Sequence, residues 1–174
     1  MIKNKFSSFD TIGSVAIFQK GKITKTLANK LLKLNKNIKT ILLKTKKISG
    51  IYRLPEYKFL AGIKTKETIH RESGCSFKLD VEKCYFSSRL SNERLRIARQ
   101  VKRNEIILVM FSGIGVYPIV ISKNSKAKEV YGIEINPKAH EYALENVMLN
   151  KIGNIHLFKG NVKTVVPKLN IKFD

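Results

Sequence analysis

Two glycines, Gly113 and Gly115, follow an apolar run at residues 106–111. In a parallel sheet, a glycine turn after a strand lets a ligand approach the backbone, and the next helix points unpaired amide hydrogens at it. The third glycine of the dinucleotide fingerprint is missing, because Pro118 takes its place. The turn therefore predicts a ligand site but disfavours NAD.

An acidic side chain and a polar turn end the next two apolar runs. Glu134 lies 21 residues after Gly113, close to the spacing of about 20 at which a carboxylate accepts both hydroxyls of a ribose. The alternative is that Glu134 only interacts with the dipole of the following helix. Gly160 and Asn161 follow the third run, where the amide could reach an adenine edge or form an ordinary turn. In this order, the three turns favour S-adenosylmethionine over a dinucleotide.

Strands and helices alternate through residues 105–174. Strands are predicted over residues 106–111, 130–135 and 155–158, and helices over residues 116–122 and 137–148. Asn136 can cap the second helix, and Pro137 suits its first position. The apolar face of that helix is predicted to hold His140, Ala143, Leu144, Val147 and Met148. This alternation is typical of a parallel sheet, which would bring the three turns to one edge.

The sequence pattern of residues 1–88 predicts a different unit, a small basic α+β module. Its predicted elements are a helix over residues 24–34 and strands over residues 11–18, 38–44, 57–60, 67–71, 77–81 and 84–86. A connecting segment, residues 89–104, contains an amphipathic helix predicted over residues 92–103. It leads into the second unit.

Positive charge is concentrated in the first part of the chain. The 174 residues carry 34 Lys and Arg against 13 Asp and Glu, a net charge of +21, of which +18 lies in residues 1–104. Such an excess favours a polyanionic partner, either nucleic acid or an anionic membrane surface. A general bias towards Lys, Ile and Asn could produce part of it. The 43% share of hydrophobic residues excludes a disordered basic tail.

Metal binding and membrane insertion find little support in the sequence. Cys75 and Cys84 have no His or Cys partner at a metal-ligand spacing, so we expect two reduced, partly buried thiols and no metal. No apolar run approaches the ~18 residues of a membrane span, and the first residues lack the apolar region of a signal peptide. The expected location is the cytoplasm.

The motifs MFSGIG (residues 110–115), EINP (residues 134–137) and, most specifically, YFSSRLSNER (residues 85–94) resemble segments of one enzyme family. These are the archaeal and eukaryotic tRNA guanine-37 N1-methyltransferases, with the related aminocarboxypropyltransferases of wybutosine synthesis. The resemblance covers nearly the whole chain. It implies a basic RNA-binding module followed by a Rossmann-like methyltransferase domain that uses S-adenosylmethionine.

The resemblance also implies roles for single residues. Glu134 would hold the ribose of the cofactor, and Asn161 would lie beside its adenine. The remaining cofactor contacts would be Phe86, Phe111, Gly113 and Gly115. Arg89 would orient or polarise the target guanine, and the basic module would bind tRNA at its anticodon stem-loop.

Departures from the family pattern bear on the function. Val109 stands where the family has an acidic residue, and Asn161 where it usually has Asp. The family's sheet has a fourth strand beside the first, whose end carries residues next to the transferred group, whereas residues 105–174 provide three strands. We therefore expect residues 105–174 to form only the first half of the methyltransferase domain, in a truncated or split chain. Such a chain is expected to be inactive, or nearly so, by itself. A second chain could complete the sheet.

The main expectation for the parent reaction is methyl transfer to N1 of guanine 37 in tRNA. Two alternatives stay open. One is transfer of the aminocarboxypropyl group from the same cofactor to a tricyclic tRNA base. The other is a non-catalytic RNA-binding remnant that has lost its cofactor affinity, consistent with Val109.

Overall fold

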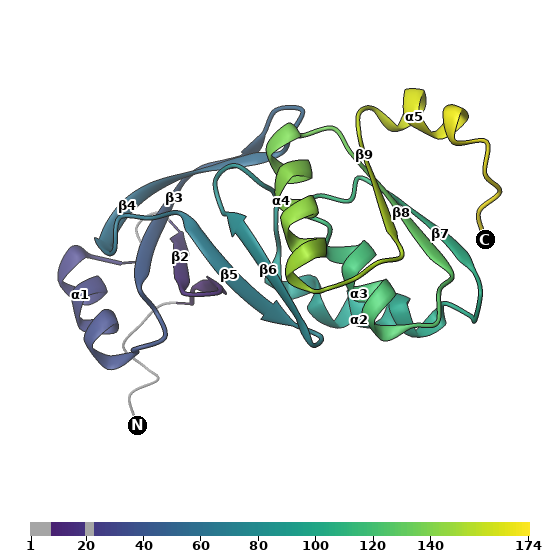
Figure 1. Ribbon diagram of the computed structural model, residues 1–174. Helices are drawn as coiled ribbons and strands as arrows, with labels where there is room; N and C mark the ends of the chain where they lie inside the picture. Colours follow the sequence, from purple (N-terminus) through teal and green to yellow (C-terminus); the bar gives the residue numbers. More distant parts are fainter. Residues whose placement is uncertain (1–7, 20–22) are drawn as a thin grey trace.

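The computed structural model describes residues 8–19 and 23–174, and within them the strands form three sheets (Figure 1). The first sheet has the order β1-β2-β3-β4, in which only β2 and β3 are parallel. Its elements are β1 (Asp10–Ile12), β2 (Val15–Gln19), α1 (Lys25–Leu34), β3 (Thr40–Ser49) and β4 (Leu54–Gly62). This mixture of one helix with mainly antiparallel strands agrees with the α+β fold class predicted for the start of the chain.

Strand β2 is buried on both faces and so joins two cores. Because alternate residues of a strand point to opposite faces, Ala16 and Phe18 pack with Leu31 of α1, whereas Val15 and Ile17 enter a second core. That second core continues through the other sheets to α3 (Val116–Asn124). The basic part of the chain is therefore packed firmly against the part that contains the glycine turn.

The single strand predicted over residues 11–18 is wrong. Gly13 has a positive φ of 53° and turns the chain between β1 and β2, which pair as an antiparallel hairpin. A Cβ atom on Gly13 would lie 2.3 Å from the backbone oxygen of Ile69, so the turn also needs the missing side chain for close packing. The sequence did not reveal the turn because the apolar residues of β1 and β2 follow each other closely and resemble one apolar strand.

A two-stranded hairpin, β5 (Glu67–Glu72) and β6 (Cys75–Asp80), forms the second sheet. The strand predicted over residues 84–86 is absent. The carboxylate of Asp80 accepts hydrogen bonds from the N–H groups of Glu82 and Lys83, at 2.8 and 3.2 Å, and this turn ends β6. The chain then runs irregularly into the short 3-10 helix η1 (Ser88–Leu90) and into α2 (Ser91–Gln100).

The third sheet is the parallel sheet predicted from the alternating pattern. Its strands are β7 (Ile106–Met110), β8 (Glu129–Glu134) and β9 (Ile155–Lys159), in the order β7-β8-β9. Helices α3, α4 (Pro137–Leu149) and α5 (Val162–Leu169) follow the three strands in turn. The predicted α/β class of this part of the chain is confirmed.

Helix α4 begins as predicted but buries a different face. Asn136 caps it, because its side-chain oxygen accepts the N–H of Lys138 at 3.0 Å. The buried residues are Ala139, Ala143 and Asn146, whereas two members of the predicted face, Leu144 and Met148, are exposed. The predicted face is therefore wrong in part.

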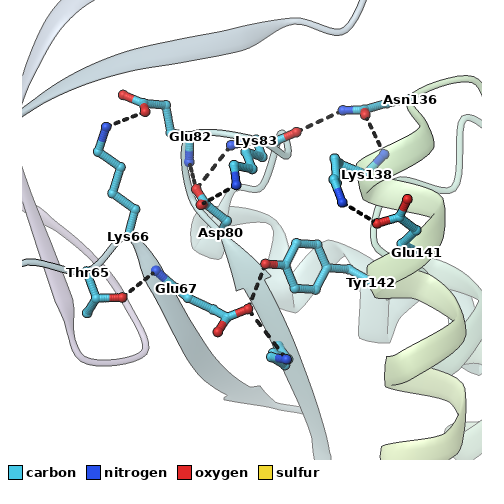
Figure 2. Close-up of polar contacts among 11 residues, drawn as sticks. Thr65, Lys66, Glu67, Asp80, Glu82, Lys83, Asn136, Lys138, Glu141 and Tyr142 are labelled. Atoms are coloured by element: carbon cyan, nitrogen blue, oxygen red, sulfur yellow. Dashed lines mark hydrogen bonds and ion pairs between the residues drawn. The ribbon is translucent and has the colours of Figure 1, made fainter.

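Polar contacts attach α4 to the β5–β6 hairpin (Figure 2). The hydroxyl of Tyr142 donates to Glu67 at 2.7 Å, and the amide of Asn136 donates to the backbone oxygen of Lys83 at 2.9 Å. Farther along the helix, Asn146 accepts the N–H of Lys78 at 2.7 Å and donates to its oxygen at 3.0 Å. These bonds fix α4 along its length, and the start of this helix forms one wall of the candidate site.

Two further findings concern the ranges 8–19 and 23–174. None of their helices is both long and apolar enough to cross a bilayer, and no group of three or more His, Cys, Asp or Glu side chains is placed to hold a metal ion. Cys75 and Cys84 are free and buried, more deeply than predicted. Burial raises the pKa of the Cys84 thiol to about 12, so this thiol stays protonated at neutral pH.

Candidate active site

The glycine turn between β7 and α3 has a backbone that few residues other than glycine adopt. Gly113 and Gly115 have φ values of 58° and 81°, and Phe111 has a φ of 63°. A Cβ atom on Gly115 would lie 3.3 Å from the Cβ of Ala143, so this glycine lets the start of α3 pack against α4. For Phe111 the left-handed conformation costs roughly 1–2 kcal/mol, and the ring is nevertheless 73% exposed. Strain of this kind is typical of ligand sites.

The carboxylate of Glu134 joins the glycine turn to the start of α4. One oxygen accepts the N–H of Gly113 and the other accepts the N–H of Asn136, both at 2.7 Å. The side chain is 8% exposed, so its position is well defined. A carboxylate has about four acceptor positions, and two therefore remain for the hydroxyls of a ribose. Glu134 thus contacts the following helix start and also keeps the capacity for a ligand.

A hollow of about 160 Å³ opens beside Glu134, and we call it the glycine-turn hollow. One side consists of the glycine turn and the start of α4, and the other consists of the β3–β4 turn with Tyr85. Its lining residues are Ile51, Tyr52, Arg53, Tyr85, Phe111, Gly113, Glu134, Ile135, Asn136 and Ala139.

A second hollow, of about 280 Å³, contains Arg89 and is called the arginine hollow. It is lined by Asp10, Ile12, Ile17, Gln19, Lys44, Ile48, Tyr57, Tyr85, Phe86, Ser87, Ser88 and Arg89. Tyr85 lines both hollows, so the two are neighbours across one side chain. Burial, together with the charges of Asp10 and Glu82, raises the pKa of Tyr57 to about 12. The Tyr57 phenol therefore keeps its proton at neutral pH.

Phe86 is held between β5 and α2 by the side chains of His70 and Arg94. The Arg94 guanidinium lies 5.3 Å from the centre of the Phe86 ring, and His70 meets the same ring edge-on at 5.0 Å. Arg94 also donates two hydrogen bonds to Glu72, at 2.6 and 2.7 Å. Burial alone would raise the pKa of Glu72, but hydrogen bonds from His70 and Arg94 outweigh it and lower that pKa. The network fixes one wall of the arginine hollow.

The predicted site residues are distributed over these hollows. Phe111, Gly113 and Glu134 lie together in the glycine-turn hollow, and Phe86 lies with Arg89 in the arginine hollow. The other two lie elsewhere: Gly115 is at the base of the turn, and Asn161 caps α5 by accepting the N–H of Lys163 at 2.9 Å. The roles assigned to all seven residues stay predictions, including the cofactor contact of Phe86, which lies in the arginine hollow and apart from Glu134.

Sequence reasoning missed the residues that the basic part of the chain brings to the site. Ile51, Tyr52 and Arg53 come from the β3–β4 turn, and Asp10 and Tyr57 come from β1 and β4. The available signal was a pair of large apolar residues, Ile51 and Tyr52, directly after Gly50 in an otherwise Lys-rich stretch. That signal alone does not say what the turn contacts.

Comparison with known proteins gives a consistent result. A family model described as the TRM5/TYW2 methyltransferase domain matches residues 68–174. The tRNA (guanine(37)-N(1))-methyltransferase Trm5b of Pyrococcus abyssi is 39% identical over 93% of this chain and 50% of its own length. The tRNA(Phe) (4-demethylwyosine(37)-C(7)) aminocarboxypropyltransferase of Methanocaldococcus jannaschii is 44% identical over 84% of this chain and 58% of its own length.

Solved structures show the same likeness. The aTrm5 chain in its complex with tRNALeu aligns with a TM-score of 0.83 at 32% identity, over 92% of this chain and 49% of that one. TYW2 of M. jannaschii in complex with AdoMet aligns with a TM-score of 0.67 at 34% identity, over 91% of this chain and 58% of that one. The chain spans about half the length of the curated relatives it matches.

Proposed function

Because the chain belongs to the TRM5/TYW2 methyltransferase family, we propose that it serves the transfer of a methyl group from S-adenosylmethionine to N1 of guanine 37 in tRNA. The observation that carries the proposal is the pair of adjoining hollows that share Tyr85. One has the features of a nucleoside site, and the other presents an arginine. A donor and an acceptor bound in adjoining hollows would meet beside Tyr85.

The glycine-turn hollow suits the methyl donor. Glu134 has free acceptor positions for ribose hydroxyls, and the exposed ring of Phe111 offers an apolar surface at the same hollow. S-adenosylmethionine, when bound, supplies a methyl group on a positively charged sulfur. The turn's own contribution is to hold the nucleoside while excluding water from one side of it.

The arginine hollow suits the acceptor base. The Arg89 side chain is 76% exposed, so its guanidinium is accessible to RNA. Methylation at N1 of guanine requires loss of the N1 proton, and negative charge then spreads to O6. A guanidinium near O6 stabilises that charge. The protonated phenol of Tyr57 is a second hydrogen-bond donor in this hollow.

The charge of the chain supports an RNA partner for this site. Residues 1–104 carry +18 of the net +21, and Lys44 and Arg89 bring part of it to the arginine hollow. Phosphate neutralisation by such side chains makes binding strongly dependent on salt. We propose the anticodon stem-loop of tRNA as the partner. We also propose that a second chain could add strands to the parallel sheet β7-β8-β9.

One alternative reaction has specific support. The aminocarboxypropyltransferase of M. jannaschii is 44% identical over 84% of this chain, whereas the P. abyssi methyltransferase is 39% identical over 93% of it. Both transfers start from the same cofactor, so the glycine-turn hollow serves either. Mass analysis of tRNA after incubation with S-adenosylmethionine separates them, because the two added groups differ in mass.

The proposal is tested first by measuring cofactor binding, which does not depend on methyl transfer. We expect S-adenosylhomocysteine to bind the purified chain in calorimetry, and Glu134→Ala to weaken that binding at least tenfold by removing the ribose acceptor. Arg89→Ala is the matched control, because it should leave cofactor binding unchanged and weaken tRNA binding. A chain that binds tRNA but no S-adenosylhomocysteine would instead be the RNA-binding remnant.

A further inference from the structure

Four large apolar or aromatic side chains surround the glycine-turn hollow without being buried. Ile51 and Phe111 are each 73% exposed, and Tyr52 and Tyr85 are about 40% exposed. Single exposed apolar residues are common on protein surfaces. Here four of them, from three separate segments, line one hollow that also contains the buried carboxylate of Glu134. Such a grouping indicates a surface that a ligand covers.

The β3–β4 turn is shaped to reach this hollow. Gly50 and Arg53 have φ values of 73° and 52°, and the N–H of Arg53 donates to the oxygen of Gly50 at 3.0 Å, which closes a tight turn. The register between β3 and β4 shifts between Lys46 and Ser49, just before the turn. Irregularities of this kind bend a hairpin and redirect its end, often beside an active site.

A contact with Tyr85, on the same side of the hollow, fixes the turn. The Arg53 guanidinium lies 5.8 Å from the centre of the Tyr85 ring, a distance at which a cation is attracted by the ring face. The same hairpin also lines the arginine hollow through Lys44 and Ile48 of β3. The hairpin of the basic part of the chain is therefore a common wall of both hollows.

We propose that the β3–β4 turn, residues 51–53, is part of the cofactor site, with Tyr52 and Ile51 packing on the nucleoside that Glu134 holds. This inference rests on the proposed function and adds a ligand contact from outside the parallel sheet. The nucleoside is favoured over the sulfonium end for two reasons. First, the wall opposite the turn consists of Glu134, the proposed ribose acceptor, and the start of α4. Second, the turn carries the cation Arg53, which would repel the positively charged sulfur of the cofactor.

Equilibrium binding of adenosine and of S-adenosylhomocysteine to the purified chain tests the contact. Tyr52→Ala should weaken both ligands by the same factor, about tenfold, because the ring would touch only the part that they share. Tyr52→Phe keeps the ring and should bind like the unmodified chain. Ile63→Ala is the matched control, since Ile63 is also exposed (58%) and lies outside both hollows.

A fluorescent reporter gives a second measurement. The chain contains no Trp, so Tyr52→Trp introduces a single indole at the turn. Saturating adenosine should change its emission, because the nucleoside would cover the ring. The emission of Ile63→Trp should not change. If saturating adenosine leaves the emission of Tyr52→Trp unchanged, the inference is overturned.

The outcomes separate this inference from the function on which it rests. If the unmodified chain binds adenosine, Glu134→Ala weakens binding and Tyr52→Ala does not, the cofactor site stands and the role of the turn is refuted. A loss confined to S-adenosylhomocysteine refutes the placement on the nucleoside. If neither ligand binds the unmodified chain, the cofactor site and the inference both fail.

Discussion

The guanidinium of Arg89 is held by the carboxylate of Asp10 through two hydrogen bonds of 2.8 and 2.9 Å, although 79 residues separate them in the chain. The pair joins β1 of the first sheet to η1, the short helix that follows the irregular segment at Phe86. A paired, planar guanidinium has its orientation restricted before any RNA arrives. Asp10 is therefore a positioning residue for Arg89 in the proposed function.

The Asp10–Arg89 pair is expected to contribute little to stability. Arg89 is largely exposed, and exposed ion pairs contribute about 0.2–1 kcal/mol. A double-mutant cycle with Asp10→Ala and Arg89→Ala, followed by urea unfolding, should give a coupling free energy in that range. A coupling well above 2 kcal/mol would mean that the pair is mainly structural. Asp10→Asn should leave S-adenosylhomocysteine binding unchanged, because Asp10 lies outside the glycine-turn hollow.

The buried pair of Glu72 and Arg94 is expected to behave in the opposite way. Both side chains are 3% exposed, so Arg94→Met leaves the buried Glu72 carboxylate with only His70 as a side-chain partner, 3.3 Å away. The change should lower the free energy of unfolding, at the lower end of about 3–5 kcal/mol. Replacing both residues with Met should recover much of that loss, since no charge is then left without a partner. Urea unfolding of the single and double variants measures this. A double variant no more stable than the single one would contradict the explanation.

The same pair predicts a dependence of stability on pH. The pKa of Glu72 is lowered in the folded chain from its ordinary value of 4.5, so the unfolded chain binds the proton more readily. The stabilisation is therefore fully present above pH 4.5 and is lost as the pH falls through the lower, folded pKa. The difference in unfolding free energy between the unmodified chain and Glu72→Gln should shrink between pH 7 and pH 3. A difference that does not change with pH would exclude this coupling.

The local patterns of the sequence were sufficient to predict the parallel sheet and its turns. Asn136 and Pro137 marked the start of α4, as the Asn136 cap confirms. The strand order placed the turns of Gly113 and Glu134 next to each other in the sheet, and the structure joins them by a 2.7 Å hydrogen bond. These features depend on residues close in sequence or on the fixed geometry of a strand, a turn and a helix. Such features leave a pattern that can be recognised without a structure.

The parts that could not be predicted depend on contacts between distant segments. Tyr52 and Phe111 line one hollow although they lie in different sheet units, and no periodicity records such a contact. The face of α4 was misjudged because a polar residue, Asn146, is fully buried. Asn146 donates to the backbone oxygen of Ile114 as well as pairing with Lys78. A hydrophobic pattern assigns such a residue to the solvent side.

Asn146 is therefore expected to matter more for stability than the apolar residues beside it. Asn146→Ala leaves the N–H and oxygen of Lys78 and the oxygen of Ile114 without a partner, and should cost roughly 2–4 kcal/mol. Leu144→Ala is the control on the same helix. Since Leu144 is 47% exposed, that change should cost less than about 1 kcal/mol. Chemical denaturation would contradict this account if the two variants were equally stable.

The conformation of the glycine turn can be tested with two alanine substitutions. Gly115 and Gly74 have similar φ values, 81° and 73°, so Ala at either position costs about 1–2 kcal/mol for the left-handed backbone. Only at Gly115 would the new Cβ meet a neighbour, the Cβ of Ala143 at 3.3 Å, whereas the space around Gly74 is open. Gly115→Ala should therefore be the more destabilising change in urea unfolding.

The two substitutions should also differ in their effect on the ligand. Gly115→Ala should push α3 away from α4 and displace the N–H of Gly113 from Glu134, and so weaken S-adenosylhomocysteine binding severalfold in calorimetry. Gly74→Ala lies in the β5–β6 turn and should leave that binding unchanged. Equal losses of stability with unchanged binding in both variants would show that the close contact between α3 and α4 does not position the glycine turn.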